Sequence, residues 1–174
     1  MDMDELVLAR YIEAVRAEGR QASWGYHSQA SVAHRYVAMT VPKVACTTIK
    51  MALQTWEGCG PGPDRWGDVH ANWAGPTLLA YPTAQIVEML RSPDYLRFSF
   101  VRNPYSRLVS AWKSKLAWDD PQYGQVRASI REPTRPIALA TVYDPPLAGR
   151  VYGHYIADFE TFGYHQNSWR FRPR

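Results

Sequence analysis

The segment formed by residues 35–50 restricts the possible folds of this chain more than any other stretch. Residues 36–41 are apolar and β-rich, as in a buried parallel strand. Pro42 ends this strand because it offers no amide donor to a neighbour. Thr47 or Thr48 can cap a following helix, since a hydroxyl accepts hydrogen bonds from first-turn amides. We therefore predict a strand, a tight loop and a helix in succession.

The predicted helix carries one apolar stripe and then stops at Gly58. The stripe positions, at i, i+3, i+4 and i+7, are Ile49, Ala52, Leu53 and Trp56. The loop before the helix would direct backbone amides, the positive end of the helix dipole and the Lys43 ammonium at one point, which favours a phosphate-type anion. Because the spacing differs from G-x-x-x-x-G-K-[ST], the loop does not predict a nucleoside triphosphatase.

Composition predicts one folded domain over the 174 residues. Apolar residues make up 46% of the chain and seven residues are tryptophan, which argues against disorder. The net charge of +4 suits a polyanionic ligand. The arginines are scattered rather than gathered in a stripe, so we do not expect nucleic acid as a partner.

The cysteine count and the hydropathy lead us to expect a cytoplasmic protein. Cys46 and Cys59 are the only cysteines, too few for a disulfide framework. No stretch approaches the roughly 20 apolar residues of a membrane span, so no transmembrane segment is expected. The acidic start does not read as a signal peptide. The sequence gives no indication of the oligomeric state.

Several further elements follow from periodicity and from turn residues. Residues 2–18 and 83–91 have helical patterns, and residues 96–101 read as a second central parallel strand. We expect loops at 21–33 and 58–76, one short strand at 137–143, and a frayed basic tail at 165–174.

A second anion site is predicted where residues 96–101 lead into the next helix. Asn103 as N-cap and Pro104 after it are a strong helix start. Ser110 can lean back toward the guanidinium of Arg102 at the strand tip, although Arg102 could instead only pair with a carboxylate. Because ligands of open α/β folds bind at the carboxyl ends of strands, the two sites together would suit a nucleotide with 5′ and 3′ phosphates.

These motifs resemble the sulfotransferases that use 3′-phosphoadenosine 5′-phosphosulfate (PAPS), especially the carbohydrate sulfotransferases of the chondroitin and HNK-1 type and their bacterial relatives. Residues 42–50 (PKVACTTIK) look like their 5′-phosphosulfate loop, within a unit at 34–56. Residues 100–112 (FVRNPYSRLVSAW) look like their 3′-phosphate motif, within a unit at 96–116. Residues 151–164 are similar to the helix that closes these domains.

The resemblance implies an α/β fold, a P-loop-like three-layer sandwich with a central, mostly parallel sheet flanked by helices. It implies sulfuryl transfer from PAPS, without a metal, to a hydroxyl or less often an amine of an acceptor, which we expect to be a carbohydrate. Lys43 matches the lysine on the leaving phosphate, and Arg102 with Ser110 match the 3′-phosphate pair. The positions that match the 5′-phosphosulfate loop are Ala45, Cys46, Thr47 and Thr48.

The acceptor hydroxyl needs a base, and some relatives carry a histidine between the two motifs. His70 is our candidate, although a solvated loop histidine fits the same sequence; His34 is a weaker candidate. Only about forty residues separate Ser110 from Tyr152, fewer than the resemblance leads us to expect. The alternatives are therefore a compact enzyme for a small acceptor and a shortened nucleotide-binding module without turnover. A phosphoryl-transfer enzyme is a more distant alternative.

Overall fold

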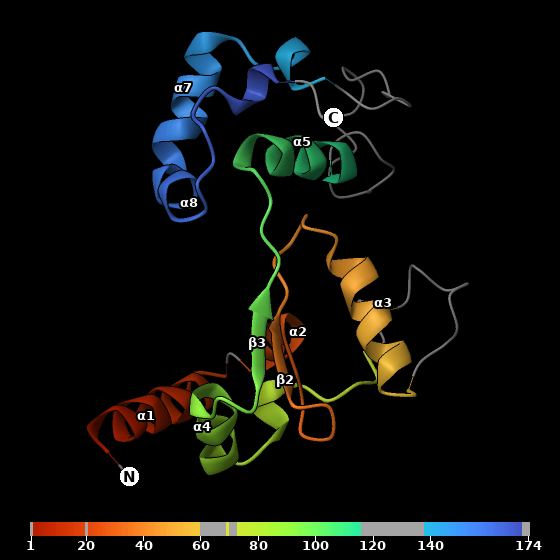
Figure 1. The fold of residues 1–174 in the computed structure, drawn as a ribbon, viewed down its shortest axis with the longest axis vertical. Coiled ribbons are helices and arrows are strands. Elements are labelled where there is room, and N and C mark those ends of the chain that lie inside the picture. The colour runs from red at the N-terminus through yellow and green to blue at the C-terminus, as the bar shows by residue number, and fades with distance from the viewer. Residues whose placement is uncertain (1, 20, 60–68, 70–72, 116–137, 172–174) are drawn as a thin grey trace. The chain divides into compact units, whose positions relative to one another are not determined.

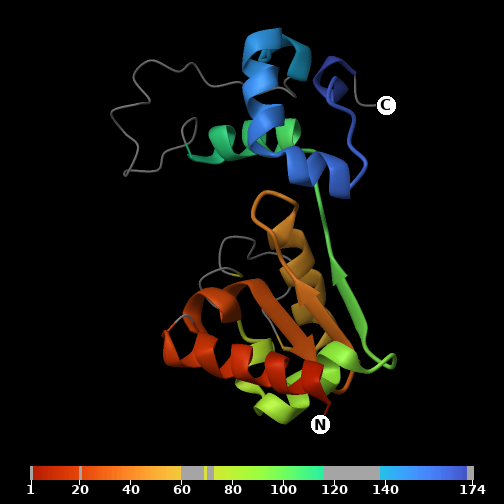
Figure 2. The same ribbon diagram turned by 90° about the vertical axis from the view of Figure 1, so that its left-hand side faces the viewer.

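The computed structural model describes residues 2–19, 21–59, 69, 73–115 and 138–171 (Figures 1 and 2). The chain divides into two compact units, Met1–Phe100 and Val101–Arg174. Unit 1 contains α1 (Met3–Ala17), α2 (Gln21–His27), β1 (Ser28–Ser31), β2 (Tyr36–Met39), α3 (Cys46–Trp56), the 3-10 helix η1 (Leu78–Ala80), α4 (Thr83–Arg91) and β3 (Leu96–Ser99). Unit 2 contains α5 (Pro104–Lys115), η3 (Leu139–Thr141), α7 (Pro145–His154), α8 (Ile156–Thr161) and η4 (Ser168–Arg170). The single domain expected over residues 1–174 stays a prediction.

The sheet of unit 1 has three strands in the order β1-β2-β3 and is mixed. β2 runs parallel to β3, with Tyr36 opposite Leu96 and Met39 opposite Ser99. β1 runs antiparallel to β2, with Ser28 opposite Met39. The expectation of a mostly parallel sheet is therefore not met in the described part, where one of the two pairings is antiparallel.

The antiparallel strand β1 and the helix α2 lie where the sequence suggested a loop, at residues 21–33. The polar composition of β1 favoured the prediction of a loop, yet all four of its residues are buried. Nearby carbonyl groups accept from two of its polar side chains, since the Ser28 hydroxyl donates to Trp24 at 2.6 Å and the Gln29 Nε2 donates to Tyr26 at 3.0 Å. The Oε1 of Gln29 has no hydrogen-bond partner among the described residues. Local backbone acceptors thus allow a polar strand to be buried.

Helices lie against both faces of β2. Val37 belongs to a cluster with residues of α1 and α4, including Ile12 and Ile86. Tyr36 and Ala38 point the other way and contact Leu53 of α3, as the alternation of side chains along a strand requires. A sheet flanked by helices is therefore observed in unit 1, while the likeness to P-loop proteins stays a prediction.

The helical patterns of α1 and α4 are confirmed. Asp2 caps α1 through a reciprocal capping box with Glu5, and Gly19 follows the helix with a φ of 69°. The bounds of α4 agree with the predicted helix over residues 83–91. In both cases strong cap or proline signals coincide with a clear apolar face.

The predicted second strand is confirmed as parallel to the first, but it is neither central nor as long as expected. β3 ends at Ser99 and lies at one edge of the described sheet. Leu96, Arg97 and Ser99 are exposed. The weak alternation of polar and apolar residues in this segment suggested a strand that is buried on both faces. A strand at the edge of a sheet does not need to be buried on both faces.

Unit 2 has its own core of aromatic and aliphatic side chains from every one of its described elements. Tyr105 is completely buried at the start of α5; its hydroxyl donates to the Gln166 carbonyl at 2.7 Å. Tyr143 in turn donates to the Tyr105 carbonyl at 2.9 Å. Trp169 of η4 is only 7% exposed within this core. The frayed tail expected from the sequence is therefore wrong up to residue 171, because Trp169 anchors it.

Two other predictions for this unit need correction. The strand expected at residues 137–143 is wrong in the described part, where η3 forms and the Tyr143 amide donates to the Leu139 carbonyl at 3.0 Å. No neighbouring strand is described there, so local bonds satisfy the backbone instead. The single closing helix expected at residues 151–164 is divided into α7 and α8 at Tyr155.

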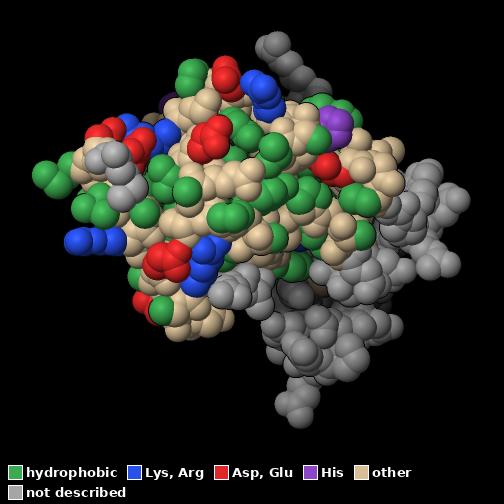
Figure 3. All heavy atoms as spheres, turned by 90° about the horizontal axis from the view of Figure 1, so that it is seen from below, with side chains coloured by type: hydrophobic (Ala, Val, Ile, Leu, Met, Phe, Trp, Pro, Cys, Tyr) green, Lys and Arg blue, Asp and Glu red, His purple; other side chains and the backbone are tan. Residues whose placement is uncertain are grey.

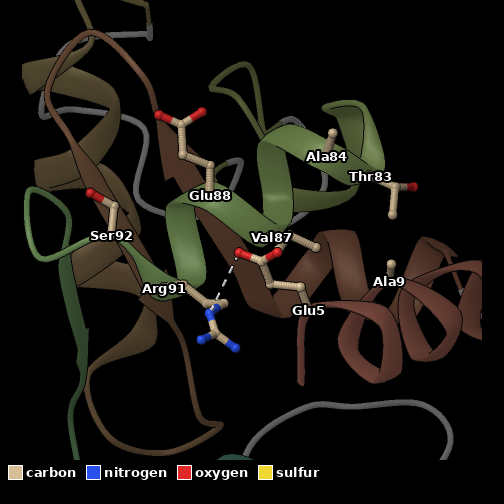
Figure 4. A pocket seen from close by; sticks show the side chains of 8 residues that line it. All are labelled: Glu5, Ala9, Thr83, Ala84, Val87, Glu88, Arg91 and Ser92. Atoms are coloured by element: carbon tan, nitrogen blue, oxygen red, sulfur yellow. Dashed lines mark ion pairs between the residues drawn. The ribbon is translucent and has the colours of Figure 1, made fainter. Parts of the chain in front are cut away.

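The face of unit 1 that carries α1 and α4 mixes hydrophobic, acidic and basic side chains (Figure 3). A pocket of about 640 Å³ lies between these two helices. Arg91 lies 4.0 Å from Glu5 at this pocket (Figure 4). Arg91 also pairs with Asp2 at 2.9 Å. None of the predicted site residues that the structure describes lines this pocket.

Candidate functional site

The predicted 5′ loop leaves the sheet at the carboxyl end of β2 and is fixed there by α2. Thr40, which follows β2 and is 4% exposed, donates its amide to the His27 carbonyl at 2.7 Å. The Thr40 carbonyl lies 2.9 Å from Nδ1 of His27. Because a carbonyl can only accept, Nδ1 carries the proton in this bond. The two bonds hold the start of the loop in a defined place.

The loop turns through two residues with left-handed backbones. Lys43 has a φ of 67° and Ala45 a φ of 68°, and Val44 between them is buried. Residues other than glycine occupy this region at a cost of about 1–3 kcal/mol, and such strain concentrates at ligand sites. Left-handed residues at a turn can direct successive amides towards one point and form an anion-binding concavity. Sequence reasoning did not anticipate this, because neither residue is glycine.

The helix α3 begins at the end of the loop without a side-chain cap. Ala45 occupies the N-cap position, and α3 begins at Cys46, so the hydroxyls of Thr47 and Thr48 lie inside the first turn. The prediction that a threonine caps this helix is therefore wrong. An N-terminus whose cap residue has no side-chain acceptor leaves the dipole and first-turn amides suited to an outside anion.

The buried face of α3 differs from the stripe predicted for it. Its buried residues are Lys50, Leu53 and Gln54. Trp56 is 54% exposed, although its ring stacks on Tyr36 with centroids 5.6 Å apart. Positions 50, 53 and 54 share one side of the helix, and the sequence carries no signal that this side faces the core, because two of the three residues are polar.

Lys50 is a buried cation one turn after Cys46. Its side chain is completely buried, and its ammonium has no hydrogen-bond partner among the residues that the structure describes. Its Nζ lies 3.5 Å from the centroid of the Tyr26 ring. Burial lowers the pKa of Lys50, while the nearby Cys46 thiol acts to raise it.

The predicted 3′ unit is divided by the boundary between the two compact units, and Arg102 and Ser110 both belong to the second. The Arg102 guanidinium is exposed, and its Nε donates to the Ser106 hydroxyl at 3.1 Å. Ser106 donates in turn to the Asn103 carbonyl at 2.9 Å. Ser110 is half-buried on the same helix. Ser106 is thus a contact of Arg102 that sequence reasoning did not include.

The start of α5 confirms the predicted capping by Asn103. Its side-chain oxygen accepts from the Tyr105 amide at 3.1 Å, and its amide nitrogen donates to the Ser168 hydroxyl at 2.7 Å. Asn103 therefore joins the first turn of α5 to η4. Arg107, on the face that also carries Ser110, pairs with Asp158 of α8 at 3.0 Å. These contacts fix Asn103 and Arg107 of the predicted 3′ motif within unit 2.

The two predicted motifs both follow the same edge of the unit 1 sheet. Met39 and Ser99 are paired in the parallel register, so β2 and β3 end side by side. Lys43 follows four residues after Met39, and Arg102 follows three residues after Ser99. The Ser99 hydroxyl also donates to the Met39 carbonyl at 2.8 Å, which fixes the two strand ends together. The predicted neighbourhood of Lys43 and Arg102 beyond this edge stays a prediction.

The two histidine candidates have different outcomes. His70 lies outside the described residues. His34 is exposed in the turn between β1 and β2, and its ring lies 4.7 Å from that of Trp56. Across the described ranges, no group of three or more His, Cys, Asp or Glu side chains is arranged to hold a metal ion. In the same part of the chain, no helix combines the length and the apolar character that a membrane crossing needs.

Comparison with known proteins gives matches in one family. A model described as "Sulfotransferase family" matches residues 28–138, which include both predicted motifs. Carbohydrate sulfotransferase 11 of Rattus norvegicus is 36% identical over 86 residues, which are 47% of this chain and 24% of that protein. The Danio rerio carbohydrate sulfotransferase 14 is 31% identical over 99 residues, 57% of this chain and 24% of that protein. No solved structure matches the chain.

The match extends over only part of the relatives, since the aligned chain spans about a quarter of their length. The cytoplasmic location expected from the sequence is wrong, because the carbohydrate sulfotransferases 11 and 14 that it resembles are not cytoplasmic enzymes. That expectation relied on two cysteines and on the absence of an apolar span. Neither feature fixes the compartment of a chain that corresponds to a part of its relatives.

Proposed function

The chain belongs to the sulfotransferase family, and from this premise we propose that it transfers a sulfuryl group from PAPS to a hydroxyl of a carbohydrate acceptor. The observation that carries the proposal is the loop from β2 to α3. It combines left-handed residues at Lys43 and Ala45 with a helix start that has no side-chain cap. Its neighbour in the sheet, β3, leads from the same edge into the predicted 3′ motif.

We assign the 5′-phosphosulfate to Ala45, Cys46, Thr47 and Thr48. The fit is supported by the uncapped start of α3, because its amides and dipole favour a doubly charged group. The hydroxyls of Thr47 and Thr48 lie in the same turn and add two donors.

Lys43 has the catalytic role in this proposal. PAPS supplies a sulfuryl group bonded through a bridging oxygen to the 5′-phosphate, and negative charge grows on that oxygen as the bond breaks. An ammonium there stabilises the transition state more than the ground state, which lowers the barrier. The half-buried position of Lys43 on a fixed loop suits this role, because a positioned charge requires little reorganisation.

Arg102 and Ser110 would bind the 3′-phosphate, as a guanidinium is matched to phosphate geometry. The Arg102 Nε donates to Ser106, and such a contact orients the guanidinium. His70 is our proposed general base for the acceptor hydroxyl, a role that contributes typically 10²–10⁴-fold. That assignment depends on the sequence resemblance.

The alternative function is a nucleotide-binding module without turnover. It is favoured by one observation, the short segment of about forty residues between Ser110 and Tyr152, where the resemblance leads us to expect more residues for the acceptor. The chain would then retain both phosphate sites and lack the residues that bind an acceptor. Both functions require nucleotide binding, but only the enzyme transfers a sulfuryl group to an acceptor. An assay of sulfate transfer therefore separates them.

The test is transfer of labelled sulfate from PAPS to a panel of hydroxyl-bearing mono- and oligosaccharides. We expect transfer to at least one acceptor, and we expect Lys43→Ala to reduce turnover by about 10²–10³-fold while most nucleotide affinity is retained. His70→Ala should reduce turnover with unchanged affinity for adenosine 3′,5′-bisphosphate. Nucleotide binding with no transfer to any acceptor would favour the non-catalytic module. Absence of binding to this nucleotide would contradict both functions.

A further inference from the structure

The ammonium of Lys50 is buried in unit 1 without the partners that such a group needs. An ammonium has three donors, yet none of them has a hydrogen-bond acceptor among the described residues. The side chain is 0% exposed. Its described contact is the ring of Tyr26, whose centroid lies 3.5 Å from Nζ.

Such a burial is costly for a folded chain. An isolated charge loses its hydration, and the cost is met in full only by pairing or hydrogen bonding. A desolvated cation–π contact is worth about 2 kcal/mol or more and so offsets a part of the cost. Leucine or methionine at this position of α3 would have no such cost. The charge at position 50 therefore points to a use other than packing.

The position of Lys50 indicates what that use is. Lys50 lies one turn after Cys46, the first residue of α3, and side chains on a helix lean towards its N-terminus. The electrostatic interaction between Lys50 and the Cys46 thiol is consistent with this direction. A side chain at position 50 thus leans towards the first helical turn from the buried face of α3, and the loop residues Lys43 and Ala45 precede that turn along the chain. Charges in a buried site are little screened, so their field reaches further than that of exposed lysines.

We propose that Lys50 is a second cation of the 5′-phosphosulfate site, a positioning residue that attracts the 5′ group through the first turn of α3 without contacting it. The inference rests on the proposed function, in which this turn holds the 5′-phosphosulfate. Lys43 and Lys50 then act from different sides, one from the loop and the other from the core. A lysine that only packs on Tyr26 would not change the affinity of the site for a 5′-phosphate.

The experiment compares Lys50→Met with wild type in binding to two probes, adenosine 5′-monophosphate and adenosine 3′-monophosphate. Methionine is also unbranched, is one atom shorter than lysine and carries no charge. We expect about tenfold weaker binding of the 5′-phosphate, equivalent to about 1.4 kcal/mol, and binding of the 3′-phosphate within twofold of wild type. The melting temperature should be equal to that of wild type or higher, because the buried charge is removed. Arg10→Met, which removes an exposed charge from α1, is the matched control and should leave both affinities unchanged.

The outcomes separate the inference from the proposed function. If wild type binds both probes and Lys50→Met binds them equally well, the inference is wrong and the proposed function stands. Equal loss of both affinities, or a lower melting temperature, would assign Lys50 a structural role. If wild type binds neither probe, the proposed function is wrong and the inference with it. Should Lys50→Met not fold, Lys50→Gln repeats the comparison, and failure of both variants to fold would also overturn the inference.

Discussion

At the scale of single residues, the two lysines of the β2–α3 segment are in opposite surroundings. Lys43 is half-buried on a left-handed loop position, whereas Lys50 is fully buried in the core of the same unit. The motif alone suggested Lys43 as a ligand, because it precedes the helix start. Lys50 differs from a surface lysine only in its three-dimensional environment, which a motif does not describe.

Arg102→Ala should remove the preference for a 3′-phosphate. In wild type we expect adenosine 3′,5′-bisphosphate to bind more tightly than adenosine 5′-monophosphate, because the guanidinium forms a charge-assisted bond to the extra group. Loss of such a bond costs about 1.5–3 kcal/mol, so calorimetric affinities for the two nucleotides should become similar in the variant. The matched control is Arg150→Ala on α7, which should keep the wild-type ratio. A preference retained in Arg102→Ala would contradict the assignment of Arg102.

The limits of prediction at this scale are clear in the 5′ loop. The sequence indicated where the loop lies and that it should bind an anion. It did not indicate left-handed backbones at Lys43 and Ala45, because that conformation is ordinarily associated with glycine. Nor did it indicate an alanine as the N-cap, since threonines with capping ability follow immediately. Propensity favours the threonine cap, and the geometry of the turn overrides it.

At the scale of elements, prediction succeeded where local signals and burial agree. The bounds of α4 and the start of α5 follow from proline, asparagine and a clear apolar face. β1 was missed, because its residues are small and polar and its burial depends on contacts with β2 and with the carbonyl of Pro76. Long-range pairing of this kind leaves no periodic signal in the sequence.

Tyr143 should make unit 2 sensitive to alkaline pH. Burial, followed by the neighbouring Tyr105 and Tyr155, raises the pKa of Tyr143 from 10.0 to about 12. Above pH 10.0 the unfolded chain therefore releases this proton while the folded chain retains it. The unfolded state then binds fewer protons, so the free energy of unfolding falls as the pH rises through this interval.

Tyr143→Phe should reduce this fall. Denaturant unfolding at pH 9 and pH 11 measures it, and the loss of stability between the two should be smaller in the variant than in wild type. At pH 9 the variant should itself be about 1–3 kcal/mol less stable, because the Tyr105 carbonyl loses its donor. Tyr11→Phe, at an exposed position of α1, is the control and should keep the wild-type pH dependence. An equal fall in Tyr143→Phe and wild type would contradict the assignment.

At the scale of the whole molecule, the chain carries two predicted phosphate motifs on two compact units. The parallel pairing of β2 with β3 agrees with the sequence prediction. The prediction of a frayed tail was wrong up to residue 171, because Trp169 anchors η4 in the core of unit 2. Composition indicates how much apolar surface a chain can bury. It does not indicate whether the buried residues form one compact unit or two, and it does not reveal a buried strand of polar residues such as β1.

Ligand-induced stabilisation tests the molecule as a whole. Adenosine 3′,5′-bisphosphate should raise the melting temperature more than ATP with magnesium, since the first carries both phosphates that the two motifs are proposed to bind. A ligand that binds only the folded state at 100 times its Kd adds about 2.7 kcal/mol. Differential scanning fluorimetry at matched concentrations measures the difference. An equal response, or a larger response to ATP with magnesium, would contradict the proposed nucleotide.

The buried charge at position 50 also has a consequence for how the protein can change. If variants are selected for heat resistance alone, apolar side chains should accumulate at this position, because they relieve the desolvation of the ammonium. If the same library is selected for capture of a 5′-phosphorylated nucleotide, lysine should persist. Selection for heat resistance and selection for ligand binding would then favour different residues at position 50. Deep mutational sequencing of the two selected libraries measures this difference.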